Sequence, residues 1–482
     1  MALCAARVAA AENNEDQLFE EDLFHKEAAK TPAKTDTSKQ AKESAPNENS
    51  LFDSLENNKA PSTKESFKST LKNSLQNKEK TLDIGGRFFY TNTLLVAEKN
   101  QVGEGRLGTH GNVDLYFDKR FDEDLRFFYQ QKISNSVSTQ QSFIPLVLSR
   151  LNDQNDVDQL WLKFSLQQQY YFTVGKQPTK LGTGFVWQPT DFLNIDRFNP
   201  LDLSDQRLGV NLIKLQIPFP EEKLNLYAIT QFDDASTLEE SGVLLRAEYV
   251  ASSGEYAFSA KSSKDSQIRV GIDSSVNLKY FDWLLSLAGV HNDPTPFILS
   301  APDPSVLNLG YVLPPSQTLD RSSEWFKQLS TGWLYTRSIF TNKTFLFNGE
   351  VFYNEAGYTQ RDVLPFIIVN SFIPGSKTSF NPLYFGKEYA ALGFTLQGLG
   401  SDADQSLTLL TISNFDDHTG VSQVVHRSQP FRDLSLSVAF GWFFGKDGVF
   451  RPDLGETTVP FAESLIIAPP KFSGSVQLSL SF

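Results

Sequence analysis

The C-terminal segment, residues 471–482, constrains the fold of this chain more than any other stretch. Apolar and polar residues alternate along its length, so that each kind lies on one face of an extended strand. The apolar positions are Phe472, Val476, Leu478, Leu480 and Phe482. This alternation is long for a strand of a soluble sheet, but it suits a tilted membrane crossing of about 9–11 residues. The segment therefore predicts a membrane-crossing strand, with an edge strand of a soluble β-protein as the alternative.

Segments in which apolar and polar residues alternate recur from residue 82 onward. The connections between these segments are short turns and long loops in strict alternation. Short turns are predicted at 122–123, 168, 218–222, 252–254, 280–281, 341–342, 400–404 and 430–433. Long loops are predicted, among others, at 179–205 and 294–315. Up-and-down barrels of the outer membrane have short turns at one end and long loops at the other. The pattern predicts an all-β fold, a transmembrane up-and-down antiparallel β-barrel of about 18 strands (16–18).

Composition agrees with this fold and excludes others. The mean hydropathy is −0.30, and no run of about eighteen apolar residues occurs, which excludes a helical membrane protein. In the strands of a membrane barrel only every second residue faces lipid and needs to be apolar, so a low mean hydropathy is expected. The single cysteine, Cys4, excludes a disulfide framework and a cysteine-based metal site. No cofactor is expected.

The N-terminal residues differ from the rest of the chain. Residues 1–11 resemble the remnant of a secretory signal peptide, although an ordinary disordered N-terminus fits them as well. Residues 12–80 are rich in Lys, Glu, Asn, Ser and Thr, and they predict a disordered, partly helical periplasmic extension. Its mixed charges argue against nucleic acid as a partner. The barrel is predicted to comprise residues 81–482.

In a wide barrel the apolar series of each strand faces lipid and the charged series faces a wet lumen. This rule gives a set of predicted lumen-lining residues of both charge signs. They are Arg207, Asn211, Arg246, Glu248, Lys261, Arg269, Asp273, Lys279, Asn348 and Glu350. Mixed charges suit a polar channel better than a ring selective for one kind of ion.

Two features resemble a known family. The terminal Phe482 is similar to the closing residue of Gram-negative outer-membrane β-barrels, and the resemblance implies that the barrel-assembly machinery recognises it. Gly175-Lys-Gln177, followed by Trp187 and by Asn199-Pro-Leu-Asp202, resembles porin-type transport barrels. The loop that follows Gln177 is aromatic and rich in turn residues, so we expect it to fold into the lumen as a constriction. The alternative is a cap on the outer surface. The predicted constriction residues are Lys180, Phe185, Trp187, Asp191, Asp196 and Arg197.

These patterns predict a porin-like channel of the Gram-negative outer membrane that passes small polar solutes without a chemical step. The alternative is a structural or adhesion barrel with binding loops and no significant conductance. Expected partners are outer-membrane lipid, small polar solutes, the assembly machinery and a periplasmic partner of residues 12–80. Both the N-terminal extension and Phe482 are expected in the periplasm. An enzyme at the rim would require His291 or His418, but no nucleophile motif accompanies them.

Overall fold

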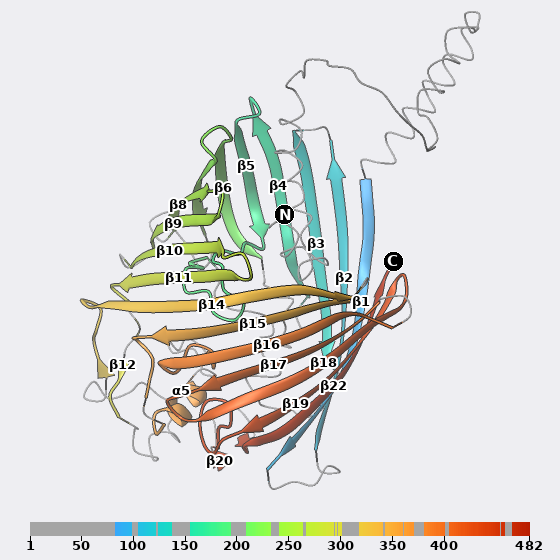
Figure 1. Cartoon of the computed structure of the whole chain (residues 1–482), viewed down its shortest axis with the longest axis vertical. Helices are drawn as coiled ribbons and strands as arrows, with labels where there is room; N and C mark the ends of the chain where they lie inside the picture. Colours follow the sequence, from blue (N-terminus) through green and yellow to red (C-terminus); the bar gives the residue numbers. More distant parts are fainter. Residues whose placement is uncertain are drawn as a thin grey trace, which may run out of the picture.

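The fold is known from a computed structural model of the chain (Figure 1). It describes residues 82–98, 105–121, 124–136, 155–193, 209–232, 241–263, 267–293, 295, 297–300, 318–340, 343–359, 361–370, 380–400, 404–453, 455–457 and 465–482. The predicted domains 1–11 and 12–80 therefore lie outside the described residues, and so does Thr81. Among the described residues, none of the helices is long and apolar enough to span a membrane.

Eighteen strands form one closed antiparallel sheet. Each strand pairs with the next in the chain, and the last strand, β22, returns to pair with β1. The strands are β1 (Leu82–Ala97), β2 (Arg106–Arg120), β3 (Leu125–Ser136), β4 (Asn155–Leu166), β5 (Tyr170–Gln177), β6 (Val210–Phe219), β7 (Leu224–Gln231), β8 (Gly242–Val250), β9 (Gly254–Ser262), β10 (Ile268–Asn277), β11 (Asp282–His291), β14 (Trp325–Phe340), β15 (Lys343–Asn354), β16 (Glu388–Leu399), β17 (Gln405–Asn414), β18 (Thr419–Phe431), β19 (Leu434–Phe444) and β22 (Pro470–Ser481). The predicted all-β, up-and-down barrel is confirmed.

Smaller elements lie in the connections. Two short hairpins pair β12 (Phe297–Ile298) with β13 (Thr318–Leu319), and β20 (Gly455–Thr457) with β21 (Leu465–Ile467). The connection between β15 and β16 contains the helix α5 (Leu364–Asn370), which the sequence did not predict. Helix α5 lies beside the ends of the strands in Figure 1.

The two ends of the barrel differ, as predicted. We call the end that holds Phe482 and the short connections the turn end, and the opposite end the loop end. Turn-end connections are as short as 341–342, between β14 and β15, whereas the loop-end connection between β5 and β6 is 178–209. The strict alternation of short and long was wrong in two places. The loop-end connections 263–267 and 415–418 are also short.

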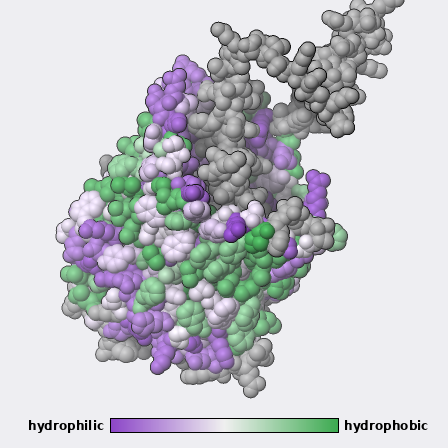
Figure 2. Space-filling model, in the orientation of Figure 1, coloured by the Kyte–Doolittle hydropathy of each residue, from purple (hydrophilic) through white to green (hydrophobic). Residues whose placement is uncertain are grey.

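The outer face of the barrel is apolar. On β10, Ile268 and Ile272 are exposed, whereas the neighbouring Asp273 is buried. On β22, Val476, Leu478 and Leu480 are exposed. Figure 2 shows broad hydrophobic areas on the visible flank, with hydrophilic residues gathered toward its upper and lower edges. A charge on this face would cost about 2–4 kcal/mol in the middle of a bilayer, which explains the clean separation.

Phe482 completes the seam where the barrel closes. Its backbone N–H donates to the carbonyl of Gly86 on β1, and its carbonyl accepts from the N–H of Gly86, both at 2.9 Å. A Cβ at Gly86 would lie 2.6 Å from the ring of Phe482, so the ring lies directly against the glycine. The terminal aromatic residue is therefore part of the β1–β22 pairing.

Candidate functional site

The segment 178–193, which follows β5, lies against the inner face of the barrel. Its residues contact side chains of β8–β11 and β15 that alternate with exposed apolar residues and hence point inward. Every residue from 186 to 193 is buried. The prediction that this part of the loop folds into the lumen is therefore in accord with its contacts, in contrast to a cap on the outer surface.

Glu350 of β15 holds the first part of this segment. Its carboxylate accepts hydrogen bonds from three successive backbone N–H groups, those of Phe185 (2.9 Å), Val186 (2.8 Å) and Trp187 (3.0 Å). It also accepts a bond of 2.5 Å from the hydroxyl of Ser330 on β14. Gly184 permits this approach, because a Cβ there would lie 2.8 Å from Oε1 of Glu350 and 2.0 Å from the carbonyl of Trp187. Glu350 is 2 % exposed, so this carboxylate binds the chain rather than water.

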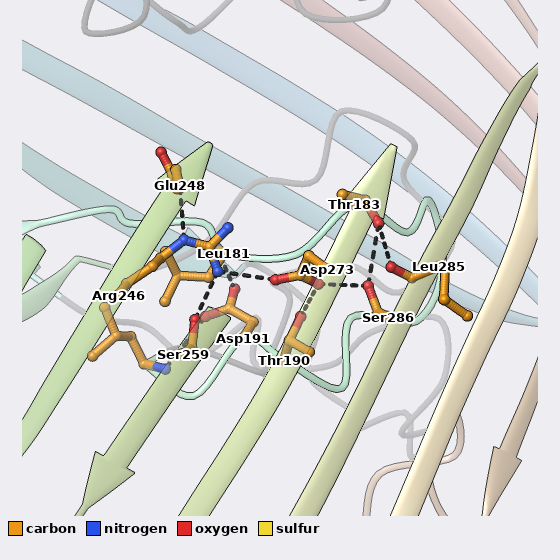
Figure 3. Close-up of polar contacts among 11 residues, drawn as sticks. Leu181, Thr183, Thr190, Asp191, Arg246, Glu248, Ser259, Asp273, Leu285 and Ser286 are labelled. Carbon is orange, nitrogen blue, oxygen red and sulfur yellow. Dashed lines mark hydrogen bonds and ion pairs between the residues drawn. The ribbon is translucent and has the colours of Figure 1, made fainter. Parts of the chain in front are cut away.

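Asp273 of β10 holds the second part. It accepts 2.5 Å and 2.7 Å hydrogen bonds from the hydroxyls of Thr190 and Ser286, and it forms a 2.9 Å ion pair with Arg246 of β8 (Figure 3). Arg246 also donates to Glu248 and to Ser259. Every charge in this group is paired or hydrogen-bonded, as buried charges must be. The group fixes Thr190 against the wall.

Two further contacts fix the C-terminal part of the segment. The ammonium group of Lys261 on β9 donates to the carbonyl of Phe192 at 2.6 Å and to Gln231 at 2.5 Å. Asp191 accepts from the backbone N–H of Leu181 (3.2 Å) and of Leu193 (3.3 Å), so it closes the loop on itself. The segment is thus anchored along its whole described length.

Trp187 carries the segment into a large apolar cluster at the loop end. Its ring stacks on Phe352 with centroids 5.5 Å apart, and its indole N–H donates to the carbonyl of Leu383 at 2.7 Å. We call this cluster the loop core. Its members are Leu95, Val186, Trp187, Ile298, Phe352, Val363, Leu364, Phe366, Ile367, Ile368, Leu383, Phe385, Tyr389, Ala391, Leu410, Ile412, Val421, Phe443, Val449 and Phe450. It joins inward residues of β15–β19 and β1 to helix α5 and neighbouring connections.

Carboxylates of the connection 415–418 fix the loop core in the same manner as Glu350 fixes its segment. Asp416 accepts from the backbone N–H groups of Lys387 and Glu388, and Asp417 accepts from that of Val449 at 2.6 Å. Arg451 donates to the carbonyls of Pro470 and Gly445 and pairs with Glu98 at 2.8 Å, across the barrel seam. The sequence did not predict these anchors, because an Asp in a turn gives no sign of which distant backbone N–H group will donate a hydrogen bond to it.

The predicted lumen residues divide into three groups. Arg246, Glu248, Lys261, Arg269, Asp273, Asn348 and Glu350 point inward, by the alternation of their strands. Arg207 lies outside the described residues, and so do Asp196 and Arg197, which were predicted as constriction residues. Two predictions are wrong. Asn211 is exposed and shares the outer face with Ile213, whereas Val210 and Leu212 face inward. Lys279 lies in the turn after β10, where its ammonium group is 5.0 Å from the ring of Tyr280.

The described residues among those predicted to form the constriction differ in burial. Trp187 and Asp191 are both 0 % exposed, so they anchor the segment and do not line a pore with their side chains. This corrects the expectation that Asp191 contributes a charge to the constriction, because its carboxylate is used by backbone amides. Phe185 packs partly buried against the loop core, and Lys180 is exposed.

The two histidines considered for catalysis, His291 and His418, lie against an aromatic ring and in a tight turn, respectively. The ring of His291 packs on that of Trp325 with centroids 4.9 Å apart. His418 lies in the short turn between β17 and β18 with φ of 58°. No group of three or more His, Cys, Asp or Glu side chains suited to a metal ion occurs within the described part of the chain.

A closed eighteen-stranded antiparallel sheet with an apolar outer face and a polar inner face defines a transmembrane β-barrel. The segment 178–193 and the loop core occupy part of the interior of this barrel.

Comparison of the sequence with protein-family models gave no match, and neither did comparison with curated proteins. Several solved structures are similar to this one in overall fold. OccK11 (OpdR) of Pseudomonas aeruginosa matches with a TM-score of 0.46 and 10 % identity over 83 % of this chain and 96 % of that one. A BenF-like porin of Pseudomonas fluorescens Pf-5 matches with a TM-score of 0.48 and 10 % identity over 83 % and 99 %.

Wzi of Escherichia coli, described as a carbohydrate-binding β-barrel involved in capsule assembly, matches with a TM-score of 0.47 and 9 % identity over 90 % of this chain and 91 % of that one. At such identities and TM-scores these likenesses concern the barrel fold alone, which the strand pairing already establishes.

Proposed function

We propose that this protein is an outer-membrane channel for small polar solutes, narrowed by the segment 178–193. The observation that carries the proposal is the attachment of this segment to the inner wall through Glu350 and Asp273. A barrel of this size is wide enough for an aqueous channel, and a fixed inward segment is a means of limiting the size of what passes. The chemistry is binding and passage, with no bond made or broken.

The inner wall supports passage of polar solutes. Charged and amide side chains of both signs point inward from β1–β4 and β8–β10, and several of them are half-exposed. A wall of this kind keeps water in the lumen and replaces part of the hydration of a passing solute. Mixed signs favour small polar or zwitterionic solutes over a single class of ion.

The proposal includes an orientation and two protein partners. Phe482 and residues 12–80 would lie at the periplasmic side, because β1 begins and β22 ends at the turn end. The barrel-assembly machinery would recognise Phe482, and residues 12–80 would be available to a periplasmic partner. Outer-membrane lipid would contact the apolar outer face.

The loop core favours a second candidate function. It fills part of the interior at the loop end with buried apolar side chains from several separate stretches of the chain. If it closes the lumen, the protein is a structural or surface-binding barrel with no significant conductance. The two functions differ in one measurable property, the passage of current.

Purified full-length protein in planar bilayers tests the proposal. Stable, ohmic single-channel steps are expected. Replacing residues 181–200 with a short Gly-Ser turn is expected to raise the conductance and to relax the size limit for sugars. Heat-modifiable electrophoretic mobility checks that the variant is folded. Absence of steps in the wild type would reject the channel and support the second candidate, whereas steps that the replacement leaves unchanged would show that the segment does not narrow the pore.

A further inference from the structure

The inner wall is divided into sectors by what packs on it. The loop core packs on inward residues of β15–β19, including Phe352 and Tyr389, and on Leu95 near the loop end of β1. A second apolar cluster packs the segment 178–193 on β6, β7, β8 and β11. Its members are Leu181, Phe192, Leu193, Val210, Leu212, Ile229, Leu244 and Ala288. Among the described residues, neither cluster includes a side chain of β2, β3, β4 or β5.

The charges on the covered sectors are already engaged. Arg246 is paired with Asp273 and Glu248, Lys261 donates to the carbonyl of Phe192, and Glu350 accepts three backbone amides. Arg246, Asp273 and Glu350 are each less than a tenth exposed. A buried charge that is neutralised by its partners has little effect on an ion passing in water.

The neighbouring sector has a charged row at one level. Arg87 of β1 is in register with Asp114 of β2, and Asp114 is in register with Lys132 of β3. All three are half-exposed, and they alternate with exposed apolar residues of the outer face such as Phe88, Leu115 and Ile133. The row therefore presents the charges +, − and + to the lumen across three adjacent strands.

An amide pair lies on the next level of the same sector. Gln130 of β3 is in register with Gln159 of β4, and the amide of Gln159 donates to the side-chain oxygen of Gln130 at 3.1 Å. Both glutamines are half-exposed. Amides supply donors and acceptors to a solute without a net charge. We call Arg87, Asp114, Gln130, Lys132 and Gln159 the β1–β4 wall.

We propose that permeation is eccentric: solutes pass along the β1–β4 wall, and Asp114 and Lys132 determine the charge selectivity of the channel. This inference rests on the proposed channel function. Two apolar clusters cover other sectors and, among the described residues of β1–β4, reach only Leu95 at the loop end of β1. Arg246, Asp273 and Glu350 on the covered sectors are buried, whereas the β1–β4 wall has half-exposed charges and amides. Selectivity is set by the fixed charges nearest to the path of the ion. Of the predicted loop charges, Asp191 is fully buried and is therefore not a selectivity residue.

Charge removal is the first test, with full-length protein in planar bilayers under a gradient of potassium chloride. Asp114→Asn is expected to shift the reversal potential toward anion selectivity, and Lys132→Gln is expected to shift it toward cation selectivity. The matched control is Arg427→Gln. Arg427 is exposed and in register with Ser437, next to the outward Val438, so it faces the lumen from β18, which β19 and β22 separate from β1. The control is expected to leave the reversal potential unchanged.

Thiol block is the second test, and it does not depend on charge removal. The chain has one cysteine, so Cys4→Ser provides a cysteine-free background. Gln130→Cys places a thiol on the β1–β4 wall, and Thr408→Cys places one on the inner face of β17, in a half-exposed position two residues from Leu410 of the loop core. A bulky cationic thiol reagent is expected to reduce the conductance at least about twofold in the first variant and by less than about a tenth in the second.

The outcomes separate this inference from the proposed function. No conductance in the wild type would reject the channel itself. A conducting wild type with opposite shifts for Asp114→Asn and Lys132→Gln, and with block at Gln130→Cys alone, supports the eccentric path. A conducting wild type in which Arg427→Gln shifts the reversal potential as much, or in which Thr408→Cys is blocked equally, would overturn it. If a charge variant fails to fold, the thiol pair still decides the question.

Discussion

Replacing Glu350 with glutamine tests whether one buried carboxylate holds the inward segment in place. The substitution keeps the length and shape of the side chain but leaves one acceptor oxygen in place of two. In the wild type, Oε2 accepts from the N–H groups of Phe185 and Val186, and Oε1 accepts from Trp187 and Ser330. The new amide NH₂ group would face N–H or O–H donors, and it cannot accept hydrogen bonds from them.

The expected loss follows from these bonds. In the Glu350→Gln variant, the single side-chain oxygen can hold at most two of the four hydrogen bonds, so two charge-assisted bonds disappear. At about 1.5 kcal/mol for each such bond, the free energy of unfolding should fall by about 3 kcal/mol. In a conducting barrel the loosened segment should also increase current fluctuations, because one or two of its three anchored amides lose their acceptor.

Urea titration of the barrel refolded in phospholipid vesicles, followed by tryptophan fluorescence, measures this loss. The matched control is Glu255→Gln, an exposed carboxylate on β9, which should change the free energy of unfolding by less than about 0.5 kcal/mol. A change of that small size for Glu350→Gln, together with an unchanged current trace, would refute the idea that Glu350 anchors the segment.

Three further predictions concern the loop core, the seam and the N-terminal residues. Trp187→Ala removes a fully buried indole that stacks on Phe352, so urea titration should show a loss of about 3–5 kcal/mol; a loss below about 1 kcal/mol would contradict this packing. Phe482→Asp should reduce the heat-modifiable barrel in membrane fractions, whereas Phe482→Tyr, which keeps the ring on Gly86, should largely restore it; equal assembly of both would deny the ring a role. A chain that starts at Thr81 behind a new signal peptide should still insert and conduct, because residues 12–80 lack the apolar content for a core, and failure to insert would show that they assist assembly.

Alternation was the most informative property of the sequence. It requires only that side chains of a strand point to opposite faces, so it identified the barrel strands and the inward positions of Asp273 and Glu350 without knowledge of any contact. It failed at Asn211, because the inner face of β6 near the loop is covered by apolar packing and therefore carries Val210 and Leu212. It failed at Lys279 because β10 ends at Asn277, before the position where the alternation was extended.

The sequence by itself determined the barrel, its apolar outer face and the inward direction of a loop rich in aromatic residues, because these follow from local periodicity and from the avoidance of water by apolar side chains. Only the tertiary structure decided which side chains hold that loop. Asp191 was predicted to line a pore and instead caps its own loop, while Glu350, predicted only to face the lumen, receives amides of residues 185–187. Pairings between residues so distant in the chain depend on how the sheet closes, and no local pattern of residues encodes them.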